Sequence, residues 1–181
     1  DFIDGVFIPD GGYGAVKVSS AGDSFDQWQD IDNNESCYAS IGRLGPIRTS
    51  GTLDKYTDLV LDGEVFDSPE KPVIFLHSNL GITFDLNEIR RVLPEGMGLS
   101  RFTARCGMSQ KVPGSGQNRA SFHVLIDGQM TFERLGVTHK DTSVSINIDI
   151  DQADRFLTLV TTDGGDAVYD DYCLFAYPVL E

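Results

Sequence analysis

The chain has 181 residues and a formal net charge of −14, with 14 basic and 28 acidic side chains. So acidic a surface disfavours nucleic acids and anionic membrane surfaces, because binding either would need Lys and Arg to neutralise phosphates. No apolar run approaches the roughly 18 residues of a membrane-spanning helix, and the length suits one domain with a substantial core. The charge remains compatible with neutral partners, with cations or with simple solubility.

The first 70 residues contain few regular elements. Residues 15–20 and 57–61 have the composition of short strands, whereas residues 22–54 are polar and rich in Gly and Asp. A connection of that length inside a compact domain indicates a binding role or hidden short strands. We predict that residues 1–70 form an N-terminal extension with strands packed on the same domain, and that residues 71–181 form a β-sandwich core.

The middle of the chain predicts two strands and one short helix. Residues 73–77 (VIFLH) and 81–86 (GITFDL) are mostly apolar or β-branched. The spacing of apolar residues over 87–93 permits a short helix that ends at Pro94, because proline disrupts helical hydrogen bonding. No long amphipathic helix is found elsewhere, which disfavours α/β folds, since their parallel crossovers usually contain one.

From residue 100 onward the sequence repeatedly has the composition of β-strands, and several segments alternate apolar and polar residues with a period of two. Asp127-Gly128, between two apolar segments, predicts a tight hairpin, because a type I′ turn needs positive φ at both central residues. Strands at this spacing are typical of a sandwich or barrel. The predicted strands are residues 100–107, 120–126, 143–150, 155–162 and 173–180.

Catalytic motifs are absent from the sequence, including HExxH, GxSxG and the Walker loop. A glycosidase would need two carboxylates across a sugar cleft, and nothing in the sequence singles out such a pair. We therefore predict that the chain is not an enzyme. Cys37, Cys106 and Cys173 form no CxxC pair, and we expect all three to be free and mostly buried.

An aspartate-rich loop precedes the last predicted strand. Carboxylates and carbonyls in a glycine-rich loop suit Ca²⁺, and a carboxylate also accepts hydrogen bonds from sugar hydroxyls. The alternative is a solvated turn in which Asp and Gly supply only turn chemistry. We name Asp163 and Asp166 as candidate calcium ligands. The acidic residues of the loop are Asp163, Asp166, Asp170 and Asp171, interrupted by Gly164 and Gly165.

Trp28 and two histidines are further candidates for a binding site. Trp28 lies in a polar segment, where its ring would either stack on the apolar face of a sugar or anchor the core. His77 ends a predicted strand and is either a buried histidine or a donor to a ligand. His123 lies on the face opposite Phe122 and Val124, so we expect it to face solvent or a second layer.

Four segments between residues 77 and 180 resemble motifs of the NPCBM domain, which includes carbohydrate-binding module family 51. They occur in the family's order, over roughly 100 residues of the chain. The resemblance implies an all-β, jelly-roll β-sandwich like that of galactose-binding domains. The segments are 77–86 (HSNLGITFDL), 100–107 (SRFTARCG), 122–128 (FHVLIDG) followed by Phe132, and a final run in which 157–160 (LTLV), 163–166 (DGGD) and 170–176 (DDYCLFA) lead to Leu180.

The resemblance also implies non-catalytic glycan binding, often beside a glycoside hydrolase, and in some members a bound calcium ion. The chain begins at Asp1 without Met, so we expect an excised part of a larger exported protein, located outside the cytoplasm. We expect the binding surface at one end of the sandwich, where loops meet. The expected contacts are His77 and Asn79 as hydrogen-bond partners, Asp171 as acceptor, Tyr172 as wall and Trp28 as platform.

Two departures from the family's pattern favour a rival interpretation. Leu174 replaces the family's acidic residue, and Phe175 replaces its tryptophan. If those two side chains contact sugar in the family, their loss favours a structural or protein-interaction module that has kept the fold and lost the sugar site. Neither the sugar nor the oligomeric state follows from the sequence.

Overall fold

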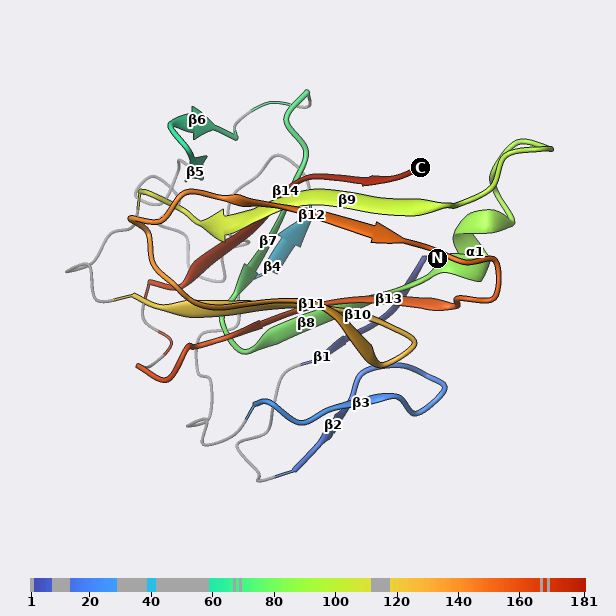
Figure 1. Ribbon diagram of the computed structural model, residues 1–181, viewed down its shortest axis with the longest axis horizontal. Coiled ribbons are helices and arrows are strands. Elements are labelled where there is room, and N and C mark those ends of the chain that lie inside the picture. The colour runs from blue at the N-terminus through green and yellow to red at the C-terminus, as the bar shows by residue number, and fades with distance from the viewer. Residues whose placement is uncertain are drawn as a thin grey trace, which may run out of the picture.

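The computed structural model describes residues 2–7, 14–28, 39–41, 59–66, 68, 70–111, 118–166, 168 and 170–181. Two five-stranded antiparallel sheets are stacked face to face (Figure 1). The first sheet has the order β1 (Ile3–Phe7), β8 (Leu80–Asp85), β13 (Phe156–Thr162), β10 (Ala120–Ile126) and β11 (Gln129–Val137). The second has the order β12 (Val144–Asp149), β9 (Arg101–Met108), β14 (Tyr172–Leu180), β7 (Val73–His77) and β4 (Ala39–Ile41).

Two short hairpins and one helix complete the described structure. In the hairpins, β2 (Val16–Lys17) pairs with β3 (Ser24–Phe25), and β5 (Val60–Leu61) pairs with β6 (Glu64–Val65). The helix α1 (Leu86–Arg90) begins directly after β8. Asp85 caps it, because its carboxylate accepts hydrogen bonds from two backbone N–H groups of the first turn. The helix ends before Pro94, as predicted, and is shorter than the predicted 87–93.

The strands predicted after residue 70 are all present, with ends that differ by no more than one residue. The predicted hairpin joins β10 to β11, and its two central residues have positive φ, 46° at Asp127 and 74° at Gly128. The N-terminal predictions are less accurate. The strand predicted over 15–20 is reduced to β2, and 22–54 contains the short strands β3 and β4.

The main core lies between the two sheets, where their inward side chains meet. Along β10, for example, Phe122, Val124 and Ile126 point into this core. Two smaller clusters cover parts of the outer faces, so β10 and β13 are buried on both sides along their whole length. The cluster on the first sheet contains Val18, Phe25, Trp28, Leu125 and Val160. The cluster on the second contains Leu59, Leu61, Phe66, Val73, Phe75, Leu174 and Ala176.

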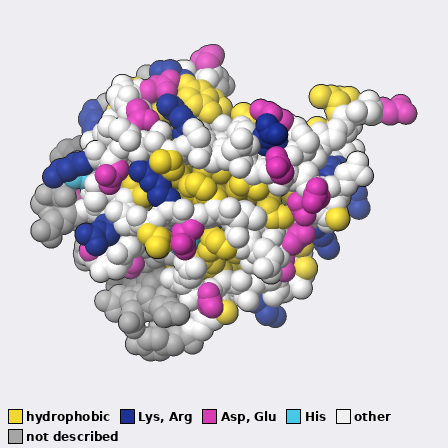
Figure 2. All heavy atoms as spheres, in the orientation of Figure 1, with side chains coloured by type: hydrophobic (Ala, Val, Ile, Leu, Met, Phe, Trp, Pro, Cys, Tyr) yellow, Lys and Arg dark blue, Asp and Glu magenta, His cyan; other side chains and the backbone are white. Residues whose placement is uncertain are grey.

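The surface in Figure 2 mixes acidic and basic side chains around an apolar band. The band lies where the edge strands β11 and β12 of the two sheets face each other in Figure 1. Partly exposed Met130 and Val144 belong to these two strands. Among the described residues, no helix is long and apolar enough to cross a membrane.

Candidate functional site

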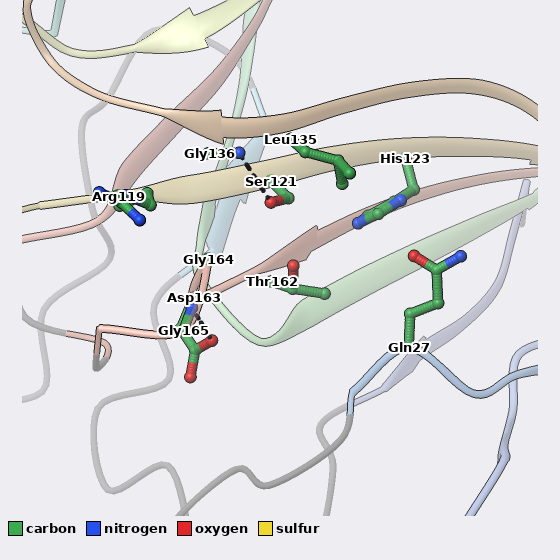
Figure 3. A pocket seen from close by; sticks show the side chains of 10 residues that line it. All are labelled: Gln27, Arg119, Ser121, His123, Leu135, Gly136, Thr162, Asp163, Gly164 and Gly165. Carbon is green, nitrogen blue, oxygen red and sulfur yellow. Dashed lines mark hydrogen bonds between the residues drawn. The ribbon is translucent and has the colours of Figure 1, made fainter.

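A hollow of about 400 Å³ lies on the outer face of the first sheet, beside the connection from β13 to β14. In Figure 1 this end of the sandwich also carries the turn between β7 and β8. Figure 3 shows that residues from separate parts of the chain surround the hollow. The lining residues are Gln27, Arg119, Ser121, His123, Leu135, Gly136, Thr162, Asp163, Gly164 and Gly165.

Asp163 is held at the rim of the hollow by Asn79. The Asn79 amide Nδ2 donates to the Asp163 carboxylate at 3.3 Å, and the backbone N–H of Asp163 donates to Asn79 Oδ1 at 3.1 Å. The second carboxylate oxygen of Asp163 accepts from the backbone N–H of Gly165 at 2.9 Å. Asn79 itself is completely buried and has a φ of 61°, a conformation that asparagine tolerates better than most residues. Asn79 therefore positions a ligand-accessible carboxylate and does not itself reach the surface.

The rim also requires a close approach of two backbones at Gly164. Its φ is +64°, and a Cβ placed there would lie 2.9 Å from the carbonyl oxygen of Arg119. Next to it, the backbone N–H of Gly136 donates to the hydroxyl of Ser121 at 3.1 Å (Figure 3). Glycine at 164 thus brings the Asp163 loop against the first residues before β10, and so closes one side of the hollow.

Behind the rim, His77 and Asp171 form a buried layer. Asp171 is 0% exposed and His77 is 4% exposed. Burial raises the pKa of Asp171 to about 8, and the nearby Asp166 and Asp163 add to the rise, whereas Ser78 and the backbone of Arg119 oppose it. These two opposing groups approach only loosely, because neither carboxylate oxygen has a hydrogen-bond partner of standard geometry within the described chain.

Tyr172 completes this layer on the side of the second sheet. Its ring meets those of Phe75 and His77 edge-on, with centroids 5.5 Å and 6.1 Å apart. Burial lowers the pKa of His77 to about 4, so its imidazole is neutral near pH 7. His77, Asn79, Asp171 and Tyr172, the predicted ligand contacts, lie near one another at one end of the fold. None of the four is among the described residues that line the hollow.

Trp28 lies in the core cluster on the outer face of the first sheet and not at a surface. It is 2% exposed, packs edge-on against Phe25 at 5.0 Å between centroids, and donates from Nε1 to the carbonyl of Thr161 at 3.2 Å. A ring covered in this way offers no face on which a sugar can stack. Of the two interpretations of Trp28, the core anchor describes its position, and we leave it out of the candidate site.

His123 faces the second layer, one of the two positions expected for it. It is 1% exposed, and its ring centroid lies 5.1 Å from that of Phe25. Burial lowers the pKa of His123 to about 4, although Glu133 opposes the change. The ring is therefore neutral near pH 7. It lines the inner part of the hollow.

Leu174 and Phe175 are both completely buried and point to opposite sides of the second sheet. Leu174 packs in the outer cluster, while Phe175 packs in the main core, edge-on to Phe122 at 5.5 Å. Neither side chain lines the hollow. The two departures from the family's pattern are therefore core substitutions in this chain, and they do not remove a group from the candidate site.

In the aspartate loop, the charges of Asp163 and Asp166 influence each other. Burial raises the pKa of Asp166, Asp163 raises it further, and Arg119 lowers it. In the described part of the chain, no three His, Cys, Asp or Glu side chains converge as a ready-made metal site. A cation at this loop would therefore need backbone carbonyls or water among its ligands.

Several residues of the hollow were not recognised from the sequence. They are Gln27, Arg119, Ser121 and Thr162, and only Arg119 and Ser121 are close together in the chain. Arg119 precedes β10, and Ser121 and Thr162 occupy outward positions of β10 and β13, whose inward positions are mostly apolar. A polar residue in such a strand is a signal that was available, but nothing in the sequence pairs these positions.

Comparisons with solved structures find the same fold in carbohydrate-binding modules. The CBM51 module of Clostridium perfringens GH95, solved with methyl-galactose, is 23% identical, with a TM-score of 0.58 over 79% of this chain and 92% of that one. The tandem CBM51 modules of Streptococcus pneumoniae Sp3GH98 are 17% identical, with a TM-score of 0.58 over 83% of this chain and 45% of that one. No curated protein matches the chain.

A third similar structure contains the CBM51-2 module, in complex with GlcNAc, and INT domains of Clostridium perfringens ZmpB. That structure is 15% identical, with a TM-score of 0.60. The match covers 98% of this chain but only 39% of the ZmpB chain. These likenesses confirm the predicted jelly-roll β-sandwich of the galactose-binding type. The sequence model of the NPCBM/NEW2 domain matches residues 28–181, which is most of the chain. The chain belongs to the NPCBM/NEW2 domain family.

Proposed function

We propose that this chain is a non-catalytic carbohydrate-binding module that holds a sugar in the hollow beside Asp163. The observation that carries the proposal is the open hollow, whose rim presents a positioned carboxylate next to a guanidinium. Sugar hydroxyls both donate and accept hydrogen bonds, so a sugar site needs both kinds of partner. Asp163 accepts, Arg119 donates, and the amide of Gln27 does both.

An apolar surface supports the same function. Leu135 is 64% exposed and lines the hollow. Pyranose rings have apolar C–H faces, and such a face removes the Leu135 side chain from water when it packs there. The combination of a polar rim and one apolar wall is typical of pockets that orient a small polar ligand.

The charge of the protein favours uncharged ligands. The net charge is −14, and among the described lining residues Arg119 is the single Lys or Arg, beside the acid Asp163. An acidic glycan would meet a repulsive field over most of the surface. Similar modules solved with methyl-galactose and with GlcNAc, both uncharged sugars, support this choice of ligand.

We also propose that the module works outside the cytoplasm as one part of a larger exported protein. Two of the similar structures are chains of which this one spans less than half. A binding module of this kind would keep a neighbouring domain close to its glycan through a linked, intramolecular encounter. A protease-protection assay on cells that express the full-length protein tests the location, and degradation only after lysis would contradict it.

Calcium binding at the aspartate loop is a separate proposal, with Asp163 and Asp166 as ligands. Burial is the main cause of the raised pKa of Asp166 and of Asp171, and repulsion from the neighbouring carboxylates adds to it. That added repulsion supports the proposal, because a bound cation would relieve it. We expect the melting temperature to be higher in CaCl₂ than in EDTA, and the difference to vanish in Asp166→Asn. An equal melting temperature in both buffers contradicts this proposal without affecting the sugar site.

A glycan array in calcium and in EDTA, followed by calorimetric titration with the best uncharged sugar, tests the main proposal. We expect Asp163→Asn and Arg119→Ala each to weaken binding at least tenfold. Arg91→Ala is a matched control, because the Arg91 side chain is 70% exposed and lies directly after α1, at the other end of the sandwich. If no glycan binds in either buffer, the rival interpretation of a structural or interaction module is correct.

A further inference from the structure

His123 is a buried polar side chain, and among the described residues only one of its two ring nitrogens has a polar side chain close to it. It is 1% exposed, and neither Nδ1 nor Nε2 makes a hydrogen bond of standard geometry in the described structure. The Glu133 carboxylate lies across the β10–β11 ladder, 3.5 Å from Nδ1, whereas Nε2 has no such neighbour in the described part of the chain. Buried polar groups in native proteins are nearly always satisfied, so an unpaired imidazole calls for an explanation such as a ligand or an ordered water.

The position of the ring makes a ligand the better explanation. His123 lines the hollow together with Ser121, which precedes it on the same outward face of β10. Figure 3 shows one ring nitrogen turned toward the space between Leu135 and Thr162. Because Nδ1 faces Glu133, Nε2 is the nitrogen on the side of the hollow, and it lies just beneath the surface of the hollow.

The chemistry of the ring restricts what it can bind. Burial keeps the imidazole neutral near pH 7, since its pKa is lowered to about 4. A neutral imidazole has one donor and one acceptor nitrogen, and a hydroxyl can form a hydrogen bond with either one. The ring of Phe25 packs against the imidazole, with centroids 5.1 Å apart and a tilt of 60°, and so supports it.

We propose that His123 is a ligand-contacting residue that sets specificity, with Nε2 hydrogen-bonded to one hydroxyl of an uncharged pyranose whose C–H face packs on Leu135. This inference rests on the proposed function and deepens it. It predicts that a sugar with that hydroxyl removed binds much more weakly, because the buried nitrogen is left unpaired again. Asp163 and Arg119 at the rim contribute affinity, whereas His123 at the inner end selects the hydroxyl.

Nitrogen-15 NMR of the imidazole rings tests the inference on the wild-type protein. Methyl-galactoside and N-acetylglucosamine are titrated separately as probes, and the ring signals of the three histidines are followed. We expect the His123 signals to shift on saturation with the probe that binds. His139 is the control, because it lies in a turn at the same end and its Nδ1 is already paired with Asn118 at 2.5 Å.

Two substitutions separate contact from packing. His123→Gln keeps a polar group near the position of Nε2, and His123→Leu keeps volume but removes it. We expect His123→Leu to lose at least tenfold in affinity with an unchanged or higher melting temperature, and His123→Gln to stay within about threefold of the wild type. If His123→Leu does not fold, the wild-type NMR titration decides alone.

The outcomes separate the role of His123 from the existence of the sugar site. If a sugar binds in an Asp163-dependent way while the His123 signals stay fixed and His123→Leu binds like the wild type, the role of His123 is refuted and the sugar site stands. If no sugar on the array binds the wild-type chain, both are refuted together.

Discussion

Replacing Asp171 by Asn is expected to remove a strong dependence of stability on pH. The carboxyl is completely buried and its pKa is raised from 3.8 to about 8, chiefly by burial. Between these two values the native state holds a proton that the unfolded chain releases. Stability therefore falls as the pH rises through this window.

The loss of unfolding free energy can be calculated from the width of the pH range in which Asp171, but neither buried histidine, changes the stability. Burial lowers the pKa of His77 and His123 from 6.5 to about 4, so their contribution is present above pH 6.5 and is lost only as the pH falls below it. Of these three groups, Asp171 is thus the one that makes the unfolding free energy depend on pH between pH 6.5 and pH 8. At about 1.4 kcal/mol per pH unit, the wild type should lose roughly 2 kcal/mol of unfolding free energy across this range.

Urea titrations monitored by circular dichroism at pH 6.5 and pH 8 measure this loss. Asp171→Asn should show nearly equal stability at both values, whatever its absolute stability, because the amide does not titrate. The exposed Asp149→Asn is the control and should keep the wild-type slope. Equal slopes in the wild type and Asp171→Asn would refute the assignment of the effect to this carboxyl. If the loop binds calcium, saturating calcium should also flatten the wild-type slope.

Three further predictions follow from close contacts. Gly164→Ala should abolish sugar binding and lower the melting temperature more than Gly165→Ala does. Both glycines have positive φ, but only at 164 does the new Cβ collide with Arg119. Equal effects on the melting temperature would contradict the close approach of the two backbones. Trp28→Phe should lower unfolding free energy by about 2 kcal/mol through lost volume and an unpaired carbonyl, while leaving sugar affinity unchanged. Phe175→Ala should cost about 3–5 kcal/mol, and a neutral result would show that this position is not core.

Much of the fold could be predicted because its signals are local. Composition and, in several segments from residue 100 onward, alternation identified the strands after residue 70, and Asp127-Gly128 identified the hairpin between β10 and β11. Positive φ at both turn residues is a property of those residues themselves. The sequence could not show that β10 and β13 are covered on their outer faces as well, because the covering side chains belong to the N-terminal hairpin.

The candidate site divides along the same line. The sequence by itself determined an all-β sandwich and its family, since strand period, turn residues and ordered motifs are contained in short stretches of chain. Only the tertiary structure decided which side chains line the hollow. That depends on what packs beside each residue: Trp28, Asn79 and Asp171 are buried away from the hollow, whereas Arg119 and His123 line it.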